Sequence, residues 1–232
     1  MIEKTTKIMM LDTETANDIE CPLVYDVGFE VFDLNGNTYA SKSFVNVDIF
    51  CDPSFMTTAY YAEKIPQYQE DIRNGKRDLA DWRKIKRVLH DIVDLFDVRI
   101  ICAHNASFDN RALNTTQRFL TSSKYRYFLP YGMEWWDTLK MSRQVFKGDE
   151  NYRQFCCENG YITKNAQNRY TAEIIYKYLT GNNDFAEQHT GLEDVRIERK
   201  IFEYCLERAP DIDGRLWKPK LEEIAIEVDY WS

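Results

Sequence analysis

The segment Lys7-Ile8-Met9-Met10-Leu11-Asp12-Thr13-Glu14-Thr15 joins a short apolar run to two acidic residues. A continuous apolar run of this kind is typical of a strand that is buried on both faces of a sheet. Side chains alternate along a strand, so Asp12 and Glu14 project to the same side. We therefore expect a central strand that carries, at its end, two carboxylates able to face one ligand.

The neighbouring segments predict a mixed sheet around this strand. Residues 23–34 and 38–45 have the composition of a second and a third strand, and Asn35-Gly36 between them predicts a tight turn. Residues 98–102 predict a fourth strand, and the aromatic segment 125–136 is expected to contain a short fifth one. Such a sheet would have a mostly parallel centre with an antiparallel meander on one side.

Helical patterns occupy the rest of the chain. The clearest runs from Asp78 to Phe96, where apolar residues recur at steps of three and four, whereas residues 46–77 show no regular pattern. Further helices are expected at residues 108–120, 138–146, 152–158, 171–179 and 191–207. The chain thus reads as one α/β domain, in which ligands gather beyond the carboxyl ends of the central strands.

The composition argues against several classes of protein. The 232 residues carry a net charge of −8, which argues against a protein that coats duplex DNA with a broad basic surface. That charge is compatible with an enzyme that holds only a few nucleotides. The six cysteines include no Cys-x-x-Cys pair and are expected to be reduced thiols. Because no apolar run is long enough to cross a bilayer, we expect a cytoplasmic protein without a membrane partner.

Two further acidic segments accompany the first. Ala103-His104-Asn105-Ala106-Ser107-Phe108-Asp109 follows the fourth predicted strand, and His189-Thr190-Gly191-Leu192-Glu193-Asp194 opens the last predicted helix. Acids gathered at one point repel each other unless cations lie among them. An all-oxygen cluster suits a pair of Mg²⁺ or Mn²⁺ ions, and such a pair suits phosphodiester hydrolysis. A histidine beside it could accept a proton from the attacking water.

The ordered set of three segments resembles the DnaQ-like (DEDDh) family of 3′–5′ exonucleases. Asp137-Thr138, followed by Leu139 and Arg143, matches the Asp-Thr pair of that family, and the resemblance covers about residues 6–208. It implies an α/β fold of the ribonuclease H-like class, a mixed five-stranded sheet flanked by helices on both faces. Residues 1–232 would form a single exonuclease domain, with 209–232 as a C-terminal tail of unassigned role.

The resemblance also implies roles for single residues. Asp12 would bridge two divalent ions, Mg²⁺ or Mn²⁺, with Glu14 and Asp194 at one ion and Asp109 at the other. His189 would be the general base, and the terminal nucleotide would leave as a 5′-monophosphate. The candidate catalytic residues are therefore Asp12, Glu14, Asp109, His189 and Asp194, and all but the histidine are candidate metal ligands.

Other residues are expected to contact the substrate or to support the site. Thr15 and Asn105 are candidates for contacts to the terminal sugar or phosphate, and His104 is expected to orient the loop after the fourth strand. Glu187-Gln188 precedes His189, where many members of the family carry a basic residue, so the substrate preference stays open.

Several functions fit these motifs. The first is removal of nucleotides from the 3′ ends of single-stranded DNA. The alternatives are an exoribonuclease that trims RNA ends, or a catalytically silent module that binds nucleic acid or protein on the same fold. A polymerase or another protein is a candidate partner, and residues 211–232, with two tryptophans, are a candidate docking element.

Overall fold

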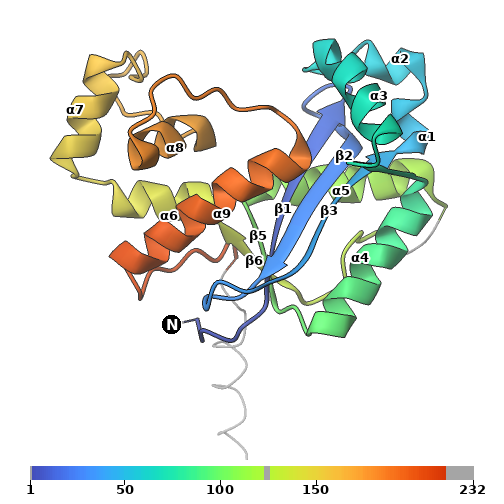
Figure 1. Cartoon of the computed structure of the whole chain (residues 1–232), viewed down its shortest axis with the longest axis horizontal. Helices are drawn as coiled ribbons and strands as arrows, with labels where there is room; N and C mark the ends of the chain where they lie inside the picture. Colours follow the sequence, from blue (N-terminus) through green and yellow to red (C-terminus); the bar gives the residue numbers. More distant parts are fainter. Residues whose placement is uncertain (1, 123–125, 218–232) are drawn as a thin grey trace, which may run out of the picture.

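The computed structural model of the chain describes residues 2–122 and 126–217. It is an α/β fold built on a mixed six-stranded sheet with the strand order β4-β3-β2-β1-β5-β6 (Figure 1). The strands are β1 (Ile8–Ala16), β2 (Leu23–Phe32), β3 (Thr38–Asn46), β4 (Asp78–Ala80), β5 (Ile100–Ala103) and β6 (Glu134–Asp137). The antiparallel pairs β1–β2 and β2–β3 form the predicted meander, and β1–β5, β5–β6 and β3–β4 are parallel.

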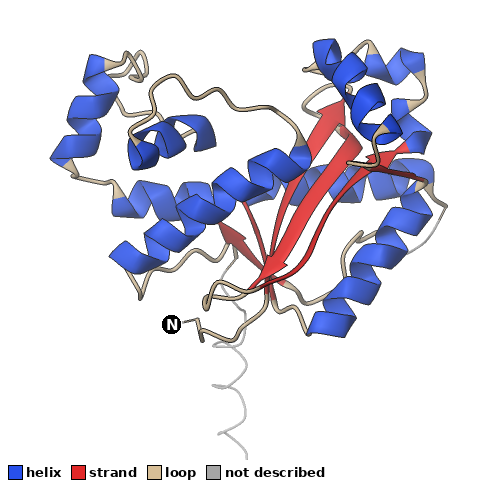
Figure 2. Ribbon diagram, viewed as in Figure 1, coloured by secondary structure: helices blue, strands red, loops and turns tan. Residues whose placement is uncertain are grey.

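Helices cover both faces of the sheet, as predicted (Figure 2). On one face α9 packs against β1 and β2, and α6 and α8 pack against α9; the other face carries α4 and α5. Their bounds, with those of the shorter helices, are α1 (Val47–Phe50), α2 (Pro53–Met56), η1 (Ala62–Lys64), α3 (Ile65–Arg73), α4 (Trp82–Phe96), α5 (Ala106–Leu120), α6 (Thr138–Val145), α7 (Glu150–Glu158), α8 (Ala172–Thr180) and α9 (Gly191–Arg208).

The central strand β1 is buried on both faces, as its apolar run predicts. Met9 and Leu11 pack into the core cluster that includes α4 and α5, whereas Ile8 and Met10 pack into the cluster that includes α6 to α9. Asp12 and Glu14 continue the alternation of Ile8 and Met10. Their side chains are therefore directed to the α9 side of the sheet.

Two predictions for the region before α4 were wrong. The sheet has six strands instead of five, because Asp78–Ala80, expected to begin a helix, is extended and pairs with β3 as β4. Helix α4 begins only at Trp82, where the side chain of Asp81 accepts a hydrogen bond from the backbone N–H of Lys84 (2.9 Å). Residues 46–77, expected to be irregular, contain α1, α2, η1 and α3.

Helix α9 approaches the sheet very closely at its first residue. A Cβ atom on Gly28 of β2 would lie 2.1 Å from the carbonyl carbon of Gly191, so only glycine fits there. Gly28 is paired with Asp12 across the β1–β2 ladder. The close contact therefore places the first turn of α9 directly beside Asp12.

The described part of the C-terminal tail packs on β6. The N–H of Leu216 donates to the carbonyl of Trp135 (2.7 Å), and the N–H of Asp137 donates to that of Gly214 (2.8 Å). Residues 218–232, which include most of the candidate docking element, lie outside the described part of the chain. Among the described residues, none of the helices is long and apolar enough to cross a membrane.

The close contact at Gly28 predicts a large cost for an added methyl group. We expect Gly28→Ala to lower the free energy of unfolding by about 3 kcal/mol, the upper end for overpacked sites, because the obstructing atoms belong to the backbone. Gly148→Ala is the control: Gly148 has a φ of +80° but open space around it, so backbone strain alone should cost about 1 kcal/mol. Urea unfolding of both variants measures the difference, and equal losses would contradict this account of the contact.

Candidate active site

Three of the four predicted acids meet beside the C-terminal half of β1, which continues beyond them to Ala16. Asp12 and Glu14 come from the strand and Asp194 from the first turns of α9, and one carboxylate oxygen of each lies within 4.8 Å of the others. The alternation along β1 and the contact at Gly28 together produce this arrangement. The structure thus brings together residues that are separated by about 180 positions in the chain.

The fourth acid, Asp109, lines the same cavity from another direction. It lies in the first turn of α5 and is 2% exposed. Its Oδ1 accepts hydrogen bonds from Thr13, from the backbone N–H (3.2 Å) and from the hydroxyl (2.8 Å). Burial raises its pKa to about 7, although the bonds from Thr13 act in the opposite direction.

Two carboxylate oxygens of this cluster have no hydrogen-bond partner among the residues that the structure describes. Asp12 Oδ2 and Asp194 Oδ1 are buried and accept no hydrogen bond from the described residues. The other oxygen of Asp194 accepts from the backbone N–H of Thr190 (3.0 Å). Burial, and repulsion by neighbouring acids, raise the pKa of Asp12 well above its usual value and that of Asp194 to about 8. Unpaired, mutually repelling oxygens fit hard divalent cations, which take oxygen ligands and cancel this repulsion.

A fifth acid, Glu198, was missed in the sequence. It is 3% exposed, lines the cavity, and accepts a hydrogen bond at Oε2 from the backbone N–H of His104 (3.1 Å). Burial and the charges of Asp109 and Asp194 raise its pKa well above the usual value. Its position four residues after Asp194, on the same face of α9, was the available signal.

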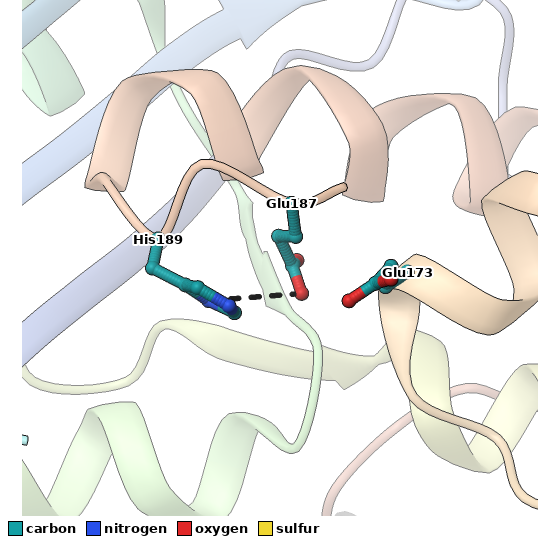
Figure 3. Close-up of side chains that lie close together, drawn as sticks. All are labelled: Glu173, Glu187 and His189. Carbon is teal, nitrogen blue, oxygen red and sulfur yellow. Dashed lines mark ion pairs between the residues drawn. The ribbon is translucent and has the colours of Figure 1, made fainter. Parts of the chain in front are cut away.

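His189 lines the same cavity as the acids. Its backbone has a φ of 52°, and its ring stacks on Tyr61 with centroids 4.0 Å apart and an interplanar angle of 9°. Nδ1 lies 3.9 Å from Glu187 Oε2, and Glu173 of α8 approaches the same place (Figure 3). Burial lowers the pKa of His189, so its ring is neutral and able to accept a proton at neutral pH.

The remaining predicted residues differ in whether they line the cavity. Asn105, with a φ of 68° at the end of β5, lines the cavity and donates its backbone N–H to Asp137 Oδ1 (3.0 Å). Thr15 is not among the cavity-lining residues. His104 has the expected structural role, because its ring nitrogens contact Thr138 Oγ1 (2.9 Å) and the carbonyl of Tyr170 (2.8 Å).

The cavity extends from the acids to the segment between α6 and α8 and has a volume of about 1060 Å³. The lining away from the acids includes three arginines: Arg143 of α6, Arg153 of α7 and Arg169 of the segment before α8. The cavity is thus acidic at one end of its lining and contains fixed positive charges elsewhere. Guanidinium groups of this kind bind phosphate oxygens well.

Comparison with known proteins shows the fold. No family model matches the chain, and no curated protein matches it in sequence. Solved structures do match: exonuclease I of E. coli with a dT13 oligonucleotide has 14% identity and a TM-score of 0.51, with 88% of this chain and 42% of that chain covered. Exonuclease I from Methylocaldum szegediense has 16% identity and a TM-score of 0.52, with 89% of this chain and 41% of that chain covered. Exonuclease I with the inhibitor BCBP has 13% identity and a TM-score of 0.54, with 90% of this chain and 42% of that chain covered.

The chain therefore spans about two fifths of the length of these structures. At such identities the match establishes a shared architecture. The six-stranded mixed sheet with helices on both faces is the ribonuclease H-like fold found in exonuclease I.

The raised carboxyl pKa values predict how stability depends on pH without metal. Unfolded carboxyls lose their protons near pH 4, whereas Asp109 and Asp194 keep theirs to about pH 7 and 8 in the folded state. Between these limits the folded protein binds more protons, so its free energy of unfolding falls as the pH rises. We expect the melting temperature in excess chelator to fall between pH 5 and pH 8.

Two variants sharpen this measurement. Asp109→Asn retains an acceptor for Thr13 and removes one repelling charge, so the fall should be smaller. Asp213→Asn is the control, because the hydrogen bonds from Arg215 hold the pKa of Asp213 at about 2 and the group stays ionised throughout. A melting temperature that rises over this range in chelator would refute the proposed burial of the acids.

Proposed function

We propose that the protein is a metal-dependent 3′–5′ exonuclease that removes nucleoside 5′-monophosphates from single-stranded DNA ends. The observation that supports this most is the convergence of Asp12, Glu14 and Asp194 in a cavity that also contains an imidazole. Two buried oxygen atoms of these acids lack a partner in the described part of the chain. A silent binding module would have no physical need to keep such a repelling cluster intact.

Five residues carry the proposed chemistry. Asp12, Glu14 and Asp194 would hold divalent ions, and Asp109 of α5 would support the second ion. Bound Mg²⁺ or Mn²⁺ would supply Lewis-acid activation of water and stabilisation of the departing 3′ oxygen. His189, neutral at pH 7, would accept the proton of the attacking water at a ring nitrogen. Asn105 and the cavity arginines would orient the terminal nucleotide.

Single-stranded DNA is the proposed substrate because similar exonuclease I structures were solved with dT13 and dA16 oligonucleotides. The cavity of about 1060 Å³ also has room for a terminal nucleotide, since pockets of roughly 300–1,000 Å³ bury most of the surface of a drug-sized ligand. End-labelled DNA and RNA oligonucleotides of one sequence, incubated with Mg²⁺ or Mn²⁺, test the proposal. A ladder that shortens from the 3′ end of DNA is expected, and faster shortening of RNA would overturn the substrate.

Asp12 gives the sharpest test of the metal cluster. Asp12→Asn should abolish metal-dependent release of mononucleotides, because the residue central to the site loses its charge. It should also remove the rise in melting temperature that Mn²⁺ causes by binding only the folded state. Asp94→Asn, an exposed carboxylate on α4, should leave both unchanged. Unchanged turnover in Asp12→Asn would refute the proposed active site.

His189 can be tested separately from the metal. His189→Asn should lower the rate of nucleotide release by about 10²–10⁴-fold, the usual effect of losing a general base, while the Mn²⁺-induced melting shift persists. His90→Asn, on α4, provides the control. A wild-type rate for His189→Asn at pH 7 would show that another group accepts the proton.

A further inference from the structure

A buried guanidinium joins four separate elements near the site. Arg77, which precedes β4, is 3% exposed. Its Nε donates to Asp71 of α3 (3.1 Å), and its Nη1 contacts Asp26 of β2 (3.3 Å) and Ser43 of β3 (2.8 Å). Its Nη2 donates to Glu193 Oε2 of α9 (2.8 Å). One side chain thus ties α3, β2 and β3 to the first turn of α9.

Asp26 completes this connection from the sheet. It is fully buried, and its Oδ2 accepts from the backbone N–H of Gly191 (3.0 Å) and from the hydroxyl of Tyr68 of α3 (2.7 Å). A carboxylate is favoured at a helix N-terminus, where free N–H groups carry partial positive charge. Glu193, besides binding Arg77, accepts from the hydroxyl of Thr190 (2.7 Å). The first turn of α9 is therefore attached at its backbone and at its side chains.

The attached turn lies between two residues of the candidate active site. His189 comes two positions before Gly191, and Asp194 comes three positions after it. On the other side, Tyr68 and Asp71 attach α3, whose preceding segment carries Tyr61, the residue stacked on the imidazole. The attachment therefore sets two distances together: that between Asp194 and the acids of β1, and that between His189 and Tyr61.

The geometry points to Arg77 and Glu193 as positioning residues that hold the N-terminus of α9 in the metal-binding arrangement. This inference rests on the proposed function, because it assigns the connection to the same site. Burying several charges is expensive, and apolar side chains could fill such a space at no loss of stability. We attribute the presence of this buried ion-pair network to the need to place the groups that it joins accurately.

Arg199 offers a matched control on the same helix. Its guanidinium contacts Glu30 of β2 (2.7 Å) and Glu203 of α9 (2.8 Å), so it too ties α9 to β2. It lies five residues beyond Asp194, about one and a half turns along the helix, and is not among the residues that line the active-site cavity. Its removal should lower stability without moving Asp194 or His189.

The experiment compares binding of Mn²⁺, by calorimetry, in the wild type and four variants. Glu193→Ala removes the carboxylate through which α9 binds Arg77. It should weaken Mn²⁺ binding by about 10–100-fold, the usual effect of losing a residue that supports a metal ligand. Arg77→Lys keeps one charge but cannot reach the same partners together, so a loss in the same direction is expected. Arg199→Ala should bind as the wild type does. Glu193→Gln lacks the charge but keeps the hydrogen-bonding atoms, so it should recover most of the affinity.

A second measurement does not depend on metal or activity. The protein has three histidines, and the ring protons of His189, identified with His189→Asn, should be displaced in the NMR spectrum by the stacked ring of Tyr61. The displacement should disappear in Glu193→Ala and persist in Glu193→Gln and Arg199→Ala.

The outcomes separate the two proposals. Wild-type Mn²⁺ affinity together with an unchanged His189 signal in Glu193→Ala would overturn the positioning role. Equal losses in Glu193→Ala and Glu193→Gln would also overturn it, since long-range charge would then explain the effect. If the wild-type protein binds Mn²⁺ but releases no nucleotides, the proposed function fails, and the same binding and NMR results still decide the role of Arg77 and Glu193.

Discussion

Acidic side chains in the C-terminal half of β1 and on α9 repel one another, and the rest of the structure has to hold them together. Asp12 and Glu14 share one side of the strand, and Asp194 and Glu198 face them from α9. Burial and mutual repulsion raise the pKa of each of these groups. These charges therefore oppose folding unless protons or cations neutralise them.

The means of holding them lie outside the cluster. Gly28 lets the backbone of α9 touch β2, opposite Asp12 in the ladder. Asp26 accepts from the first N–H of α9, and Arg77 links Asp26 to Glu193. A packed backbone contact and a buried ion-pair network thus oppose the repulsion, and both act within one turn of Asp194. His189 lies two residues before the same turn, so the position of the imidazole depends on them as well.

Much of the architecture could be predicted from residue patterns. The apolar run of β1 indicated a strand buried on two faces, and the Asn35-Gly36 turn indicated the meander. The pattern failed at Asp78–Ala80, where three residues pair with β3 before Asp81 caps α4. So short a strand depends on a distant partner, and its own sequence contains no alternation to reveal it. The short helices of residues 46–77 were missed because helices of one or two turns show little periodicity.

The sequence alone determined the chemical inventory: which acids lie on β1 and in the first turns of α5 and α9, and which histidine precedes the last of them. Spacing along a strand or helix is local geometry, so these positions could be assigned to faces without a structure. Tertiary structure decided which groups meet. It placed Glu198 in the cavity, left Thr15 out of its lining, stacked Tyr61 on His189 and buried Arg77 between four elements. Those contacts join residues tens of positions apart, and only the packing of α9 and α3 against the sheet brings them within reach.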